Sequence, residues 1–409
     1  MNVVKEKTTI TFEEVIPGYF LVMGVAAAVP IIRAFDISVF VWMELASAFL
    51  IVILRKVGTI TRCDSYAVFM IAAVISTGLA VVSCLPMAYI SNSLKAVMLI
   101  IAIWLNVNSI VKKVPGAASS FIQGVSIGAL ANAIWMIFQF AVWRLFAFDL
   151  NAYIFNELLS ITEVTSQYKA TGLVATGLCW NVGGITAAIL MGFVYFKNSW
   201  IRTLFVVAAI LSQSRTLQIG LVCIIALRLG IAAINRYRTF SRGAKKKCHL
   251  LVVVVISFMF ICATCFISKW LESPDSSGSA HLAYYANLPE LLSRMDPLQF
   301  IFGYGVDCSG FPYTALTGQY HWLKAWFVES DIVNTLLGMG VVGLLALYFH
   351  ILEVTKRLVE DKSTFALFII SVLVCGVFYN ILSVTYYWAL LLINSLPYVS
   401  DLENGMSES

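Results

Sequence analysis

An arginine stands in the middle of a long apolar part of the sequence. Arg215 lies in ILSQSRTLQIG, residues 210–220, within an apolar stretch from about residue 204 to 234. An arginine at the centre of a bilayer costs about 2.5–3.5 kcal/mol, so it needs a partner, access to water or a function. Binding an anion is one such function. The alternative is structural: Arg215 caps a helix end or reaches lipid head groups.

Two more cations and two acids surround glycine-rich or polar segments in the same half of the chain. Lys169 opens KATGLVATGL, and Arg294 lies in LLSRMDPLQFIFGYGVD, eleven residues before Gly305. Together with the first arginine, these cations could meet around one anion. Glu329 and Asp331 follow in ESDIVNTLLGMG. Such carboxyl groups can act as an acid or a base, although the two acids could also simply face water at a helix end.

The composition indicates where these residues must work. The chain is 60% hydrophobic and only 12% charged, with a mean hydropathy of +0.88, whereas about a quarter of the residues of a soluble domain are charged. Apolar runs of about 18 residues or more recur along it, and each can cross a hydrocarbon core of about 30 Å as a helix. We therefore expect an all-α, polytopic integral membrane protein that forms a single domain over residues 1–409.

The apolar runs predict about twelve transmembrane helices, of which the seventh is short. They lie near residues 16–33, 37–54, 66–87, 94–111, 118–143, 174–196, 201–212, 217–235, 249–268, 327–352, 364–381 and 384–398. If the N-terminus is cytoplasmic, the cytoplasmic loops contain most of the lysine and arginine residues, as the positive-inside rule requires. Both termini are therefore expected in the cytoplasm.

Two long polar stretches, 144–173 and 269–326, then lie on the outer face, which in a bacterium is the periplasm. The larger one separates the ninth and tenth spans, and its spacing of leucines predicts a short surface helix over 283–295. Tyr304 stands between two glycines, a pattern typical of a tight backbone. Its ring, like other aromatic rings of this loop, could stack on a ligand or simply pack within the loop.

Other chemistry is not expected from this sequence. Cys262 and Cys265 form a CxxC in the middle of a span without further ligands, so we expect packing, and we predict neither a metal nor a cofactor. The basic residues follow the topology, which argues against nucleic acid, and the run at 236–247 anchors the topology or binds anionic lipid. Glu44, within a span, should be paired or protonated.

The order of the motifs resembles the O-antigen polymerase and ligase superfamily of bacterial inner membranes. KATGL, LSQSRT, LSRMDPLQFIFGYGVD and ESDIVNTLLGMGVVGLLALYF follow one another over roughly residues 165–350, whereas the first five spans match only as apolar helices. The resemblance implies a GT-C-like membrane fold and metal-independent glycosyl transfer from an undecaprenyl-diphosphate-linked glycan at the periplasmic face. Membrane lipid and a chain-length-determinant protein are the other partners it suggests.

The resemblance also suggests which residues bind the substrate. Arg215 and Arg294 would bind the diphosphate, with Lys169 assisting. Tyr304 and Gly305 would belong to the same substrate site.

The acid–base residue decides between branches of the superfamily. Ligases, which transfer the glycan to lipid A-core, have a histidine just before the late span, where this chain has Glu329 and Asp331; His321 lies eight residues before Glu329. This favours a polymerase, with Glu329 as the preferred acid–base residue ahead of Asp331 and His321. A ligase, and a transporter or flippase of lipid-linked sugars, remain as alternatives.

Overall fold

The computed structural model describes residues 12–29, 33–34, 37–54, 64–83, 85–154, 183–238, 276–317, 328–382 and 387–399. This part of the chain is helical apart from a short antiparallel pairing of β1 (Arg33–Ala34) with β2 (Ile37–Ser38). The predicted ninth span, Lys169 and His321 lie outside the described residues.

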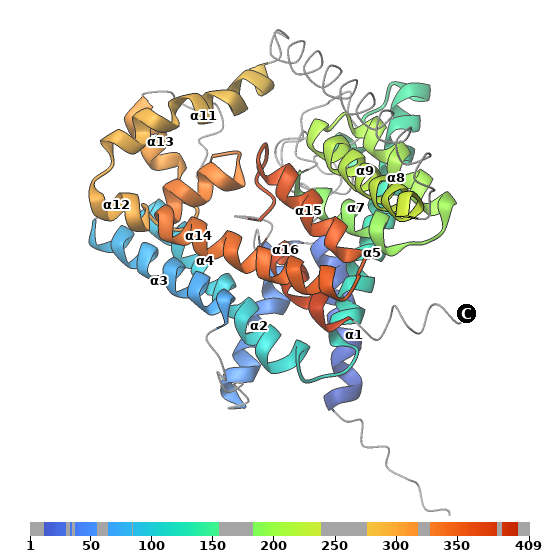
Figure 1. The fold of residues 1–409 in the computed structure, drawn as a ribbon, viewed down its shortest axis with the longest axis horizontal. Coiled ribbons are helices and arrows are strands. Elements are labelled where there is room, and N and C mark those ends of the chain that lie inside the picture. The colour runs from blue at the N-terminus through green and yellow to red at the C-terminus, as the bar shows by residue number, and fades with distance from the viewer. Residues whose placement is uncertain are drawn as a thin grey trace, which may run out of the picture.

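Most helices begin and end near the limits expected from hydropathy (Figure 1). In order they are α1 (Phe12–Ala28), α2 (Val39–Ile53), α3 (Ser65–Val82), α4 (Met87–Asn106) with the π-helical turn η1 (Val107–Val111), α5 (Ala117–Phe146), α6 (Leu150–Ala152), α7 (Gly183–Tyr195), α8 (Ser199–Ser212), α9 (Arg215–Arg238), α11 (Ser276–Arg294), α12 (Pro297–Phe302), α13 (Gly310–Thr317), α14 (Asp331–Glu360), α15 (Phe365–Gly376) and α16 (Trp388–Ser395) with the 3-10 turn η4 (Leu396–Tyr398).

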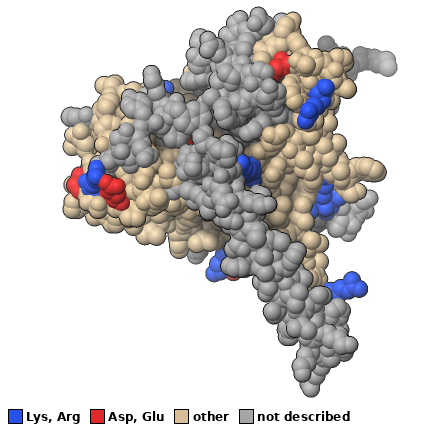
Figure 2. All heavy atoms as spheres, turned by 90° about the horizontal axis from the view of Figure 1, so that it is seen from above, with Lys and Arg blue, Asp and Glu red and all other residues tan. Residues whose placement is uncertain are grey.

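Five helices in the described part of the chain are long and apolar enough to cross a membrane. They cover Ser65–Val82, Met87–Val111, Ala117–Phe146, Arg215–Tyr237 and Asp331–Glu360, and shorter apolar helices accompany them. Large apolar side chains are exposed on them, as hydrocarbon-facing surfaces require; Leu229 is 65% and Leu345 64% exposed. In Figure 2, charged side chains form only small, separate groups on the described part of the face shown. The helical, multi-pass character is thus confirmed, and the count of twelve stays a prediction.

The described helices pack around two apolar clusters. The larger extends through the bundle, and α5 lies against both α1 and α7 within it. The smaller joins α11 and α13 to the start of α14, through Tyr284, Leu291, Tyr313, Val328, Val333 and Leu337. The predicted surface helix over 283–295 is therefore the second part of a longer helix, α11, and it is partly buried rather than only superficial.

A break in α14 receives the loop that carries the Gly-Tyr-Gly motif. Gly340 has φ +67° inside the helix, so the carbonyl groups before it lose their helical partners. The Leu337 carbonyl instead accepts from the N–H of Tyr304 at 3.0 Å, and the Gly338 carbonyl accepts from the N–H of Gly305 at 2.8 Å. The loop after α12 is thus fixed to the membrane helices by its backbone.

Glu44 shows which of the two expected states fits its surroundings. Its side chain is fully buried in α2, and neither carboxyl oxygen has a hydrogen-bond partner among the described residues. Its backbone carbonyl, by contrast, accepts from the hydroxyl of Ser47 at 2.9 Å and from the Nδ2 of Asn106 at 3.2 Å. Because an unpaired buried charge is very costly, this environment favours the protonated carboxyl group.

Candidate functional site

Arg215 is the first residue of α9, directly after a tight turn. The preceding helix ends at Ser212, Gln213 has φ +53°, and the Ser214 hydroxyl accepts a hydrogen bond from the N–H of Leu217 at 3.4 Å. The serine therefore caps the helix, which leaves the guanidinium group without that structural task. The half-buried Arg215 side chain lies at a helix end rather than in the middle of an apolar helix.

The last turn of α15 joins the start of α9 to the start of α14. The thiol of Cys375 donates to the carbonyl of Thr216 at 3.2 Å. The next residue, Gly376, lies against Asp331 so closely that a Cβ at the glycine would be 2.7 Å from the aspartate Oδ2. The residue after Arg215 and the acidic start of α14 thus contact the same helix end, although more than one hundred residues separate them in the sequence.

Asp331 is bound by backbone donors. Its side chain has no exposed surface, and both carboxylate oxygens accept from the N–H groups of Ile381 and Leu382 at 3.0–3.1 Å. These bonds hold the chain that follows α15 against α14. A carboxylate used in this way is an anchor, so the geometry favours its neighbour, Glu329, as the residue that exchanges protons.

Glu329 lies just before α14 in a partly enclosed position. Burial raises the pKa of its carboxyl group to about 7. Burial also raises the pKa of the Tyr284 hydroxyl, and the charge of Glu329 raises it further. A carboxyl group with a pKa near neutrality can both accept and return a proton at physiological pH, which is the requirement for acid–base catalysis.

Two tyrosines of α11 cover this position. The hydroxyl groups of Tyr285 and Ser330 lie 2.8 Å apart, and Tyr285 donates to the carbonyl of Val377 at the end of α15. The rings of Tyr284 and Tyr313 pack edge to face with centres 5.2 Å apart. The loop between the ninth and tenth predicted spans thus forms one wall of the site.

A buried network of hydrogen bonds connects the segment between α12 and α13 to the start of α14. Asp307 accepts from the Nδ2 of Asn334 at 3.0 Å and from the hydroxyl of Tyr387. Ser309 donates to the Oδ1 of Asn334 and accepts from the N–H of Val328 at 2.8 Å, which positions the residue before Glu329. The sequence interpretation did not include Asn334, although a polar residue inside an apolar span was a usable signal.

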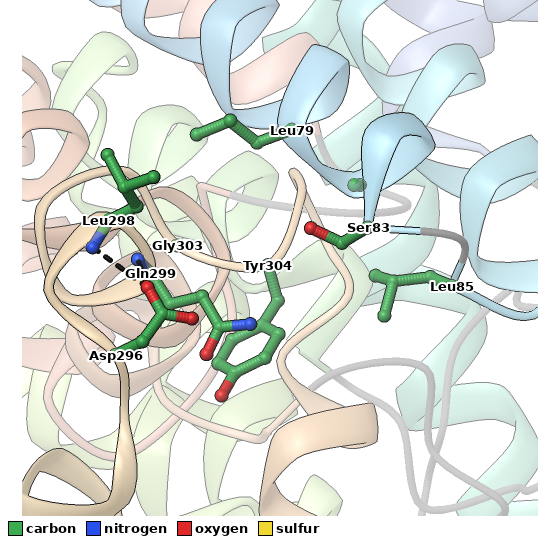
Figure 3. Close-up of a pocket in the computed structure, with 9 residues that line it drawn as sticks. Leu79, Ser83, Leu85, Asp296, Leu298, Gln299, Gly303 and Tyr304 are labelled. Atoms are coloured by element: carbon green, nitrogen blue, oxygen red, sulfur yellow. Dashed lines mark hydrogen bonds between the residues drawn. The ribbon is translucent and has the colours of Figure 1, made fainter.

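A small hollow of about 70 Å³ lies where α12 meets the end of α3. Figure 3 shows Tyr304 beside the side chain of Gln299, with Asp296 near them and Ser83 across the hollow. The Oδ1 of Asp296 caps α12 by accepting from the N–H groups of Leu298 at 2.9 Å and Gln299 at 3.0 Å. An aromatic ring, a carboxylate and an amide around one hollow match the faces and hydroxyl groups of a sugar.

Arg294 lies apart from this group. It ends α11, its side chain is 50% exposed, and its guanidinium pairs with Glu290 one turn earlier. The next helix, α12, and the helix of Arg215, α9, are on opposite sides of Figure 1. A meeting of the two arginines around one anion stays a prediction.

In the described structure, the end of α15 contacts Thr216, next to Arg215, and Asp331, two residues after Glu329. Tyr304 and Gly305 dock on the break in α14. The sequence of the chain matches no protein-family model, and it matches none of the curated proteins.

Proposed function

We propose that this chain is a membrane glycosyltransferase that polymerises a surface polysaccharide such as the O-antigen. It transfers a glycan from an undecaprenyl-diphosphate-linked donor to the terminal sugar hydroxyl of a lipid-linked repeat unit. One observation carries the proposal: the last turn of α15 contacts both Thr216, which follows the half-buried Arg215, and Asp331, which lies two residues after Glu329. The carboxyl group of Glu329 has a pKa of about 7.

The reaction has two demands that these residues meet. The bond between the anomeric carbon and the diphosphate breaks, so negative charge develops on the leaving oxygen, and a fixed guanidinium stabilises it through paired hydrogen bonds. The acceptor hydroxyl forms the new bond to the anomeric carbon and loses its proton. Glu329 takes that proton and releases it to water before the next transfer.

The hollow at Tyr304 supplies a place for a sugar ring of the growing chain. Stacking on the tyrosine and hydrogen bonds to Asp296 and Gln299 would hold the ring while its neighbours extend toward Glu329. Arg294 and Lys169 remain proposed helpers in diphosphate binding, because the resemblance to the superfamily suggests them. The site then faces the periplasmic side of the inner membrane, and both termini lie in the cytoplasm. A chain-length-determinant protein is the proposed partner.

Deleting the gene and separating surface lipopolysaccharide on a gel tests the proposal. A polymerase mutant retains core carrying a single repeat unit, whereas loss of a ligase or a flippase leaves bare core. Bare core would therefore overturn the polymerase assignment.

A reconstituted assay separates chemistry from transport. Purified protein in liposomes, given only lipid-linked repeat units, should lengthen them without added lipid A-core. Movement of the repeat units across the bilayer without new glycosidic bonds would support a transporter instead.

A further inference from the structure

Two arginines lie at the end of the α8–α9 hairpin that is remote from Arg215. Arg202 lies in the first turn of α8 and Arg228 in the second half of α9. Both helices pack against α7 and against each other, and the charge of Arg202 acts on that of Arg228. The end of α7 contacts Arg228. The Nη2 of Arg228 donates to the carbonyl of Val194 at 3.3 Å, and its guanidinium carbon lies 5.6 Å from the ring centre of Phe193.

This pair has no counter-charge within the described part of the chain. No carboxylate there forms an ion pair with either guanidinium. The Nε of Arg202 is buried and has no hydrogen-bond partner among the described residues. Two half-buried like charges repel each other, and an unsatisfied buried donor is destabilising, so both features favour a bound anion.

The surroundings indicate that the anion belongs to a lipid. Guanidinium forks match the oxygens of a phosphate. Trp200, beside Arg202, is 79% exposed, as expected of a tryptophan at the membrane–water interface, and Leu229, beside Arg228, is 65% exposed. Acyl chains can cover these apolar side chains, whereas a free, hydrated phosphate cannot.

We propose that Arg202 and Arg228, together with the end of α7, bind the phosphate group of an anionic membrane phospholipid. This site is separate from the candidate active site, which lies at the other end of the same hairpin. A lipid bound here stabilises the α8–α9 hairpin and hence the helix that carries Arg215.

The test uses the full-length protein, stripped of lipid in detergent. Phosphatidylglycerol, phosphatidylcholine or inorganic phosphate is added, the thermal unfolding temperature is measured, and retained lipid is counted by native mass spectrometry. We expect phosphatidylglycerol to raise Tm and to remain bound, with a much smaller effect of phosphatidylcholine and none of inorganic phosphate. Equal protection by inorganic phosphate would overturn the lipid as the source of the anion.

Substitutions locate the effect. Arg202→Gln or Arg228→Gln should weaken phosphatidylglycerol binding about tenfold or more, since each removes charge-assisted hydrogen bonds. Arg236→Gln, which removes the same charge from an exposed position on α9, should keep the wild-type response. A wild-type response in both inner variants, or an equal loss in Arg236→Gln, refutes the site.

If the glutamine variants do not fold, lysine variants still decide the matter. Arg228→Lys keeps the charge but loses the planar guanidinium group. It should therefore bind phosphatidylglycerol more weakly than wild type but more strongly than a variant without the charge. Wild-type affinity in Arg228→Lys would contradict the proposed bidentate contact.

Discussion

Replacing Glu329 with glutamine removes the carboxyl group whose pKa burial raises from 4.5 to about 7. A raised carboxyl pKa means that the folded protein binds this proton more tightly than the unfolded chain does. The resulting contribution to stability is present in full below pH 4.5 and is lost as the pH rises through about 7. Since one pKa unit corresponds to about 1.4 kcal/mol, the ionised folded protein should be about 3 kcal/mol less stable than the protonated one.

Thermal unfolding in nanodiscs, followed by tryptophan fluorescence between pH 4 and pH 8, measures this difference. We expect the Tm of wild type to fall relative to that of Glu329→Gln across this range, with the glutamine variant becoming the more stable protein above pH 7. Glu360→Gln is the matched control, because the side chain of Glu360 is 63% exposed. Its curve should follow that of wild type.

The same variant tests the role in catalysis. A general base must be ionised to accept a proton, so polymer formation by the wild-type protein should rise with pH around a midpoint near 7, and Glu329→Gln should lose polymer formation while inserting normally. Parallel Tm curves for wild type and Glu329→Gln would show that the carboxyl group is not desolvated, and the reasoning about acid–base catalysis would fail with it.

Three further substitutions, one of them with a matched control, test other parts of the structure. Gly340→Ala should lower Tm strongly and undock α12, because its Cβ would lie 2.2 Å from a carbonyl of that helix at φ +67°; Gly78→Ala, with no atom within 4 Å, should be neutral or stabilising by up to about 1 kcal/mol. Asp331→Asn should lower the free energy of unfolding by about 1.5–3 kcal/mol through weakened bonds to two N–H groups, measured by denaturation, and should reduce polymerisation less than Glu329→Gln does. Arg215→Lys should shorten the polymer on a gel although the charge is kept, because a lysine lacks the paired donors of the guanidinium; unchanged chain length would contradict diphosphate binding there.

Hydropathy was sufficient to place most of the described helices. A helix that crosses a bilayer must satisfy its backbone hydrogen bonds internally and present apolar side chains outward, so its signal is local in the sequence. The turn before Arg215 was also readable, because it depends on residues next to each other in the chain.

The preference for Glu329 over Asp331 came from the family resemblance, and no local sequence pattern explained it. Glu329 and Asp331 are two residues apart, yet one is half-buried and the other is enclosed and bonded to the backbone of Ile381 and Leu382. Those donors come from a segment about fifty residues later, and no local pattern shows that they end at the aspartate. The break at Gly340 is similar, since the loop that fills it comes from earlier in the chain.

The sequence by itself thus determined that the chain is a bundle of apolar helices with a few charged residues at helix ends, because hydrophobicity and helix period act over neighbouring residues. Only the tertiary structure decided which of those charges share one place. The end of α15 contacts both the residue after Arg215 and the start of α14, and the end of α7 contacts Arg228. Such meetings depend on how helices distant in sequence pack, and packing is a property of the whole bundle.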